Sequence, residues 1–179
     1  MTMFTQRENR ILGQARDIIS RYYQRGVQLC SPDDVRRCVM VELAPLEHEE
    51  FGIILLDNQN QLLHKEILFR GTLNSVSVHP REVIKRVLKH NAAAAILVHN
   101  HPSGEPEPSR CDIKLTKKFQ ELLEMLDVRL LDHFIVAGTE TVSLAERGLT
   151  AADLLIPVIP LSPAEIRRSW AGFTTHICF

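Results

Sequence analysis

The stretch AAAAILVHNHPSGEPEPS, residues 92–109, constrains the fold more than any other part of the sequence. Its first ten residues are too apolar for an edge strand, so they predict a buried central strand. The eight residues that follow contain three prolines and a glycine, which excludes regular structure and predicts an exposed loop. Such a strand needs neighbouring strands and covering helices around it.

Hydrophobic periodicity on both sides of this strand predicts an α/β fold, a mixed sheet flanked by helices. Turn-forming residues at 57–60 separate two strand-like runs, which we interpret as a hairpin. In chain order we expect helices at about 7–25 and 31–43, strands at 51–56 and 62–69, a helix from 80, the central strand, a helix from about 110, and strands at 131–137 and 142–144.

Composition fits a single globular domain with a core of its own, because 45% of the 179 residues are hydrophobic. We divide the chain into an N-terminal helical segment (1–45), a main domain (46–150) and a C-terminal tail (151–179) whose role the sequence does not indicate. With 21 basic and 22 acidic residues, the chain lacks the charge bias of a protein that contacts many phosphates.

The sequence also carries no sign of a membrane or secreted protein. No apolar run approaches the roughly 18 residues needed to cross a bilayer, and the N-terminus lacks the apolar segment of a secretory signal. The four cysteines form no C-x-x-C pair, so we expect free thiols and neither a disulfide scaffold nor a cysteine-rich zinc module. We therefore expect a cytoplasmic protein.

Two of the eight histidines, His99 and His101, are placed to bind a metal. They are two residues apart at the end of the expected central strand, so their side chains leave the same face. Asp112 follows in the first turn of the next helix, and Ser109 supplies a hydroxyl between them. Two histidines and an aspartate with an open fourth position are typical of a catalytic zinc site.

Each part of this pattern also has a purely structural interpretation. A single histidine beside a buried strand is most often a hydrogen-bonded core residue, and Ser109 with Asp112 forms the sequence of an ordinary capping box. The combination favours the metal site, because packing and capping do not explain why two histidines and a carboxylate should be brought together. A capped first turn would also hold the aspartate in a fixed direction.

The spacing of His99, His101, Ser109 and Asp112 resembles the JAMM motif, H-x-H-x7-S-x2-D, of the JAB/MPN metalloprotease superfamily. The segment FRGTLNSVSVHPREVIKRVLKHNAAAAILVHNHPSGEPEPSRCD, with LDHFIVAG after it, resembles the RadC family of bacterial proteins more closely. The similarity covers about residues 33–150. It implies a fold similar to cytidine deaminase, with Zn²⁺ held by His99, His101 and Asp112.

The resemblance also implies a catalytic glutamate at the entry to the first core strand, where the sequence reads His48-Glu49-Glu50-Phe51. Adjacent residues on a strand point to opposite faces, so only one of the two glutamates can face the metal. The family pattern, an acid followed two residues later by an aromatic residue, aligns Glu49 with this position, and Glu50 is the alternative. Composition and spacing alone do not distinguish them from Glu82, Glu105 or Glu107.

The implied activity is hydrolysis of a peptide or isopeptide bond in a protein or peptide substrate. Glu49 would transfer the proton of a zinc-activated water, and Ser109 would help to hold the developing oxyanion. One alternative is a DNA-associated accessory protein, which the family label favours and the charge balance does not. Another is a zinc or partner-binding module without activity. The oligomeric state is not predicted.

Four other residues in the resembling region have less direct interpretations. We expect structural roles for His79 and His133, and the alternative is a role behind the metal ligands. Asn100 lies between the two histidines and points away from them, so we expect it to fix a loop. Cys111 neighbours Asp112, and we assign it to packing because a thiolate ligand would leave the aspartate unexplained.

Overall fold

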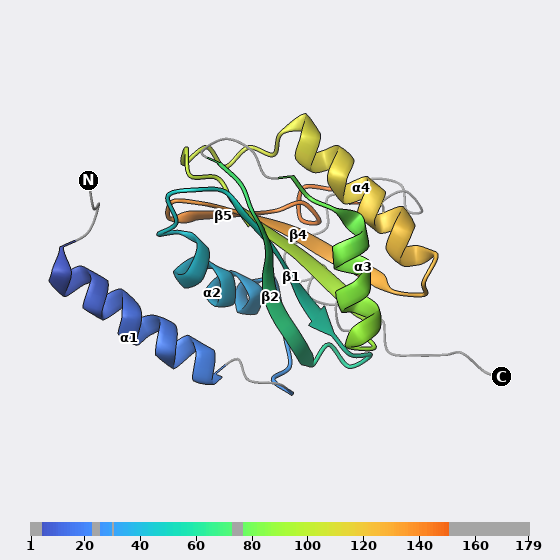
Figure 1. The fold of residues 1–179 in the computed structure, drawn as a ribbon, viewed down its shortest axis with the longest axis horizontal. Helices are drawn as coiled ribbons and strands as arrows, with labels where there is room; N and C mark the ends of the chain where they lie inside the picture. Colours follow the sequence, from blue (N-terminus) through green and yellow to red (C-terminus); the bar gives the residue numbers. More distant parts are fainter. Residues whose placement is uncertain (1–4, 23–25, 30, 73–76, 151–179) are drawn as a thin grey trace.

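The computed structural model describes residues 5–22, 26–29, 31–72 and 77–150, and it contains one mixed sheet with helices on both faces (Figure 1). The predicted tail lies outside the described residues. The elements are α1 (Gln6–Tyr22), α2 (Pro32–Leu43), β1 (Glu50–Leu56), β2 (Leu62–Arg70), α3 (Pro80–Lys89), β3 (Ala94–Asn100), α4 (Arg110–Glu124), β4 (Arg129–Ala137) and β5 (Glu140–Ser143).

The sheet has the strand order β2-β1-β3-β4-β5. β1 pairs antiparallel with β2 and with β3, β3 pairs parallel with β4, and β4 pairs antiparallel with β5. All seven residues of β3 are buried, as expected for a strand between two neighbours. The predicted hairpin, the central strand and the mixed sheet are therefore confirmed.

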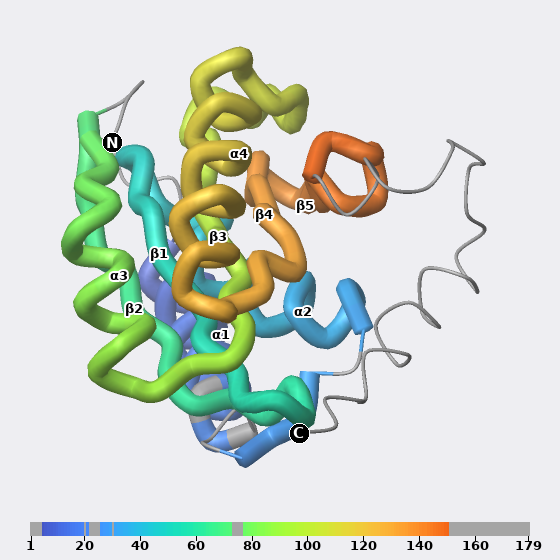
Figure 2. The backbone as a smooth tube through the Cα atoms, turned by 90° about the vertical axis from the view of Figure 1, so that its right-hand side faces the viewer, coloured from blue at the N-terminus to red at the C-terminus, as the bar shows by residue number. Residues whose placement is uncertain are grey.

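Alternation along the strands divides the core into two layers. On one face, Ile96 and Val98 of β3 pack with α2, which contributes Val35, Val39 and Leu43. On the other face, Leu97 packs with apolar residues of both α3 and α4. These two helices therefore cover the same side of the sheet (Figure 2). His99 follows Leu97 by two residues and so points toward α4.

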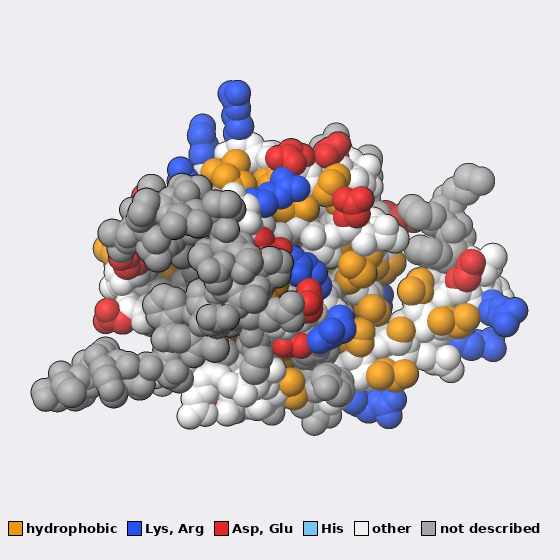
Figure 3. Space-filling model, turned by 180° about the vertical axis from the view of Figure 1, so that it is seen from behind, with side chains coloured by type: hydrophobic (Ala, Val, Ile, Leu, Met, Phe, Trp, Pro, Cys, Tyr) orange, Lys and Arg blue, Asp and Glu red, His pale blue; other side chains and the backbone are white. Residues whose placement is uncertain are grey.

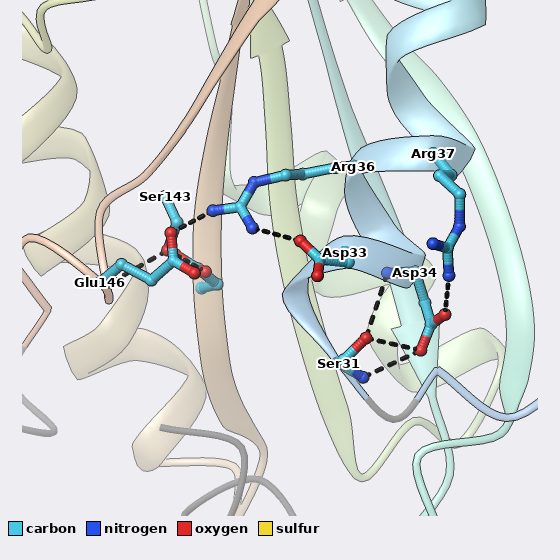
Figure 4. A network of polar contacts seen from close by, with 8 residues as sticks. Ser31, Asp33, Asp34, Arg36, Arg37, Ser143 and Glu146 are labelled. Atoms are coloured by element: carbon cyan, nitrogen blue, oxygen red, sulfur yellow. Dashed lines mark hydrogen bonds and ion pairs between the residues drawn. The ribbon is translucent and has the colours of Figure 1, made fainter. Parts of the chain in front are cut away.

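Helix α2 is fixed at both its start and its middle by polar contacts (Figure 4). Its N-cap Ser31 forms a capping box with Asp34, and Pro32 occupies the first turn. Arg36 lies between Asp33 of the same helix and Glu146, which follows β5. These contacts connect α2 to the far edge of the sheet, in addition to its apolar packing.

One glycine in the sheet is required by a close approach of the backbone. A Cβ at Gly52 of β1 would lie 2.7 Å from Ile67 Cδ1 and 2.8 Å from the Glu66 carbonyl oxygen. Real Cβ atoms do not approach other atoms so closely, so any other residue would displace β2 from β1. The absent side chain therefore sets the spacing of this strand pair.

Helix α1 is less enclosed than the other helices. Ile19 packs against the α2 face of the core, whereas Ile11 and Ile18 are 54% and 57% exposed. Apolar side chains remain visible along this helix in Figure 3, and acidic and basic side chains are interspersed over the described part of that face. No helix among the described residues is long and apolar enough to span a bilayer.

Candidate metal centre

His99 and His101 lie where the central strand ends. His99 is the sixth residue of β3 and is 1% exposed, and His101 follows the strand directly. The His101 N–H still donates to the Val136 carbonyl of β4 at 2.8 Å, so the strand geometry continues through this residue. The two side chains therefore leave the same face, and their Nε2 atoms are 3.0 Å apart.

Asp112 reaches the histidines from the first turn of α4. The loop after His101 turns back at Gly104, whose φ of 77° lies in the left-handed region that favours glycine. Ser109 then caps α4: its backbone N–H donates to Asp112 Oδ2 at 2.7 Å, and its Oγ accepts from the Asp112 N–H at 3.1 Å. This predicted capping box is confirmed, and it orients the carboxylate toward the strand end.

The three side chains converge on one place. Asp112 Oδ1 is 3.4 Å from His99 Nε2, and Asp112 Oδ2 is 3.6 Å from His101 Nε2. Bonds of about 2.0–2.1 Å in a tetrahedral zinc site place neighbouring ligand atoms about 3.3 Å apart. With one donor atom from each residue, the three atoms lie within 4.8 Å of one another, so the group could hold a metal ion, and it is the one group of this kind found among the described residues.

The ring of His101 is held in the tautomer that a metal requires. Its Nδ1 lies 2.7 Å from the Glu105 carbonyl oxygen, which can only accept a hydrogen bond, so Nδ1 carries a proton. In the metal-free protein, the hydrogen bond to Asp112 raises the pKa of His101 and favours a second proton on Nε2. A metal at this atom would displace that proton, so binding is expected to weaken in acid.

The pKa values of the other two ligands, His99 and Asp112, are shifted in the direction that favours metal binding. Burial lowers the pKa of His99 to about 4, so its imidazole is neutral near pH 7. Burial alone would raise the pKa of Asp112, but the hydrogen bonds from His101 and Ser109 and the interaction with His99 hold it well below its usual range. The site therefore combines a neutral imidazole with an ionised carboxylate.

Glu49 and Glu50 point to different surroundings. The Glu50 carboxylate is 2.9 Å from His48 Nε2 and 3.5 Å from Arg70 Nε, away from the metal ligands. The Glu49 carboxylate is half-buried and interacts with the charges of His101 and Asp112. Burial raises the pKa of Glu49, His101 lowers it and Asp112 raises it further. Of the two, Glu49 is therefore the carboxylate on the metal side.

Asn100 connects the strand that carries the histidines to the segment that carries Glu49. Its Oδ1 accepts from the Glu50 N–H at 2.8 Å, and its Nδ2 donates to the His48 carbonyl at 3.0 Å. The residues on both sides of Glu49 are thus bound to one buried side chain between the two ligands. We expected Asn100 to fix a loop beside the ligands, and the structure shows that it holds the segment that bears the proposed base.

The Ser109 hydroxyl is exposed beside the three ligands. Its oxygen accepts a hydrogen bond from the backbone of Asp112. The Ser109 side chain also hydrogen-bonds to the Asp112 carboxylate and so helps to lower the pKa of that group. The remaining glutamates considered above are engaged elsewhere: Glu82 pairs with Lys85, and Glu107 pairs with Arg147, while the Glu105 side chain accepts from the Glu107 N–H.

Sequence reasoning assigned His133 a structural role, but the structure places it directly behind His99. Its Nε2 is 2.8 Å from His99 Nδ1, and its Nδ1 is 2.7 Å from Thr116 Oγ1. A histidine within the apolar strand LLDHFIVA was the available signal. His79 contacts Phe69, at 5.9 Å between ring centroids. The assignment of Cys111 to packing is wrong, because this side chain is on the exposed face of α4.

Comparison with known proteins gives this arrangement a family context. The RadC-like JAB domain family matches residues 29–149 of the chain. UPF0758 protein YkfG of Escherichia coli (strain K12) is 47% identical over 146 residues, which are 81% of this chain and 92% of the relative. A UPF0758 protein of Vibrio cholerae is 48% identical over 141 residues, which are 79% of this chain and 89% of the relative.

Some relatives are longer than this chain. UPF0758 protein Mpe_A2695 of Methylibium petroleiphilum is 54% identical over 134 residues, which are 75% of this chain but 60% of the relative. The family match, residues 29–149, includes the sheet, α2 to α4 and all the residues of the candidate metal centre. By its sequence and by its mixed sheet with flanking helices, the chain belongs to the RadC-like JAB domain family.

Proposed function

We propose that the chain is a zinc-dependent hydrolase that cleaves a peptide or isopeptide bond in a protein or peptide substrate. The observation that carries this proposal is the convergence of His99, His101 and Asp112, whose donor atoms lie within 4.8 Å of one another, at a place where a glutamate and a serine hydroxyl also lie. Hydrolytic chemistry is general in the JAB/MPN superfamily, which supports the assignment at that level.

The three ligands would hold the ion, and each is prepared for this by its surroundings. His101 is oriented by the Glu105 carbonyl, and Asp112 is oriented by the cap of α4. A bound zinc ion would lower the pKa of a water molecule from about 15.7 to about 7 and would polarise the scissile carbonyl. The three ligands leave a fourth position for that chemistry.

Glu49 is the proposed general base and acid. It would accept the proton of the attacking water and transfer it to the leaving amine, which requires a carboxylate that both binds and releases a proton. The raised pKa of Glu49, caused first by burial, favours that role because it brings the group closer to the pH at which the enzyme would work.

Ser109 is the proposed donor to the oxyanion. Its hydroxyl oxygen accepts from the Asp112 N–H, so the group is held beside the ligands, and the proton that the resting protein shares with the Asp112 carboxylate would be donated to the substrate oxygen instead. A preorganised donor of this kind can contribute about 10²–10³ in kcat. The exposed position of Ser109 allows a substrate carbonyl to reach it.

The test compares Glu49→Gln with Glu50→Gln, a matched change at the adjacent position. We expect both variants to bind one zinc per chain, measured by elemental analysis after gel filtration. We expect only Glu49→Gln to lose hydrolysis in a screen of fluorogenic peptides and lysine isopeptides, by about 10²–10⁴-fold. Loss of activity in Glu50→Gln alone would assign the base to the other carboxylate.

The same screen includes single-stranded DNA. Activity on DNA alone would replace this proposal with a nucleic-acid-processing function. Zinc binding without hydrolysis of any substrate in the screen would favour a binding module. Unchanged zinc content in all three of His99→Ala, His101→Ala and Asp112→Ala would overturn the metal centre itself.

A further inference from the structure

A hydrogen-bonded chain behind the metal ligands joins two of them through the protein interior. His133 of β4 is fully buried and pairs in register with Leu97 of β3, two residues before His99, so both histidines lie on the α4 face of the sheet. His133 Nε2 is 2.8 Å from His99 Nδ1. On its other side, His133 Nδ1 is 2.7 Å from Thr116 Oγ1, and Thr116 is also fully buried.

The direction of every hydrogen bond in this series follows from the bond between Thr116 and Asp112. Thr116 Oγ1 lies 2.7 Å from the backbone carbonyl oxygen of Asp112, which can only accept. A hydroxyl has a single proton, so Thr116 donates it to Asp112 and can only accept from His133. The proton between Thr116 and His133 therefore belongs to His133 Nδ1.

The positions of the protons nearer the metal ligands follow from the number of N–H groups on a neutral imidazole. A neutral imidazole has one N–H, so a proton on His133 Nδ1 leaves Nε2 as an acceptor. His133 is completely buried, and the two partners of its ring are an imidazole and a hydroxyl and not a carboxylate, which keeps the ring neutral. His99 Nδ1 must then be the donor, and its Nε2 presents a lone pair toward His101 and Asp112.

We propose that Thr116 and His133 are positioning residues that fix the tautomer and ring orientation of His99 for metal binding. This inference rests on the metal centre of the proposed function and adds the device that prepares one of its ligands. This series of hydrogen bonds runs from the backbone of Asp112 to His99, so it connects two ligands without solvent. Partners of this kind, behind metal ligands, typically change metal affinity by about 10–100-fold when removed.

A purely structural role for the two residues makes a different prediction. If the hydrogen bonds only satisfy a buried histidine, Thr116→Val lowers stability but leaves the zinc affinity of the folded protein unchanged. If they fix the tautomer, the variant loses the acceptor for His133 Nδ1, and the proton can move to Nε2. His133 would then donate to His99 Nδ1 and force the His99 proton onto the atom that binds the metal.

The experiment measures zinc Kd for the full chain by competition with a chromophoric chelator. We expect Thr116→Val to raise Kd by about 10–100-fold and Thr116→Ser, which restores the hydroxyl, to return it close to the wild-type value. Thr150→Val is the matched control, because Thr150 is another buried threonine but has no hydrogen-bond partner for its hydroxyl among the described residues. Equal Kd values for the two valine variants would overturn the inference.

A second measurement does not depend on whether a variant folds. Ring ¹⁵N chemical shifts of the metal-free wild-type protein report which nitrogen of each histidine carries the proton. We expect protons on Nδ1 of both His99 and His133, and a proton on His133 Nε2 would overturn the inference. His99→Ala separates the metal centre from the role of Thr116. Unchanged zinc binding in His99→Ala would contradict His99 as a ligand, whereas a loss in His99→Ala but not in Thr116→Val would contradict only the role of Thr116.

Discussion

The chain builds the same capping box twice, at the start of α2 and at the start of α4, and connects the two carboxylates to different partners. In α2, Asp34 Oδ2 accepts from the Ser31 N–H and hydroxyl, and Oδ1 pairs with Arg37 at 2.6 Å (Figure 4). In α4, Asp112 Oδ2 accepts from the Ser109 N–H, and Oδ1 faces the imidazole of His99.

The serines of the two boxes act alike. The Ser31 hydroxyl donates to Asp34, and the Ser109 side chain hydrogen-bonds to Asp112. The boxes differ in the partner of the carboxylate outside the cap, which is Arg37 for Asp34 and His99 for Asp112. The Asp112 oxygen that faces His99 is the one that we assign to chemistry.

The largest expected effect separates the two aspartates. Asp112→Asn retains an oxygen that can accept from the Ser109 N–H, so the cap survives, but the anionic ligand is lost. We expect its zinc Kd to rise by well over the 10–100-fold typical of residues behind the ligands. Asp34→Asn should leave Kd unchanged. Similar Kd values for both variants would mean that the two boxes do not differ as we describe.

The serines provide a second, smaller contrast. Ser31→Ala and Ser109→Ala should each lower the free energy of unfolding by about 1 kcal/mol, measured by urea denaturation, because each removes an N-cap acceptor. Ser109→Ala should in addition lower kcat by about 100-fold on any substrate identified, with its zinc content retained. A wild-type kcat for Ser109→Ala would show that this serine acts only as the N-cap of α4.

Acid unfolding of the metal-free protein sharpens the comparison further. The folded-state pKa of Asp112 is lowered, so its contribution to stability is complete above the unfolded pKa of about 3.9 and is lost as the pH falls below it. Unfolding free energies of wild type and Asp112→Asn, measured with a chelator from pH 6 to pH 2, should therefore converge in acid. We expect about 1.5–3 kcal/mol to be lost. A constant difference across this range would contradict the assignment.

The smallest effect concerns the partner of the first box. Arg37 is 66% exposed, so its ion pair with Asp34 is screened by solvent. We expect Arg37→Ala to lower the free energy of unfolding by about 0.2–1 kcal/mol and to leave zinc Kd unchanged. A loss of several kcal/mol would show that the first box depends on its cation far more than an exposed pair allows.

Both boxes were readable from the sequence, because a capping box depends on residues three positions apart. The shared direction of His99 and His101 was equally local, since it follows from strand alternation. The distances among the ligands could not be predicted from neighbouring residues in the sequence. They depend on the loop that ends at Ser109 and on the packing of α4 against Leu97 and Phe51 on that face of the sheet.

The role of His133 could not be predicted from the sequence. Its contact with His99 joins residues 34 positions apart and depends on the parallel register of β3 and β4. The choice between Glu49 and Glu50 also depends on tertiary structure. Strand alternation shows that the two face opposite ways, but the surrounding residues decide which one faces the metal ligands. The family resemblance selected Glu49, and its surroundings in the structure favour the same residue.

The missing side chain at Gly52 acts on this site from a distance. The backbone of Glu49 is bound to the segment after β2, through its N–H to the Thr72 carbonyl and its carbonyl to the Gly71 N–H. A methyl group at position 52 would push β2 outward, and the base would follow the strand to which it is attached. The position of Glu49 thus depends on the absence of a side chain three residues away. An alanine at position 52 would displace the proposed base without contacting a metal ligand.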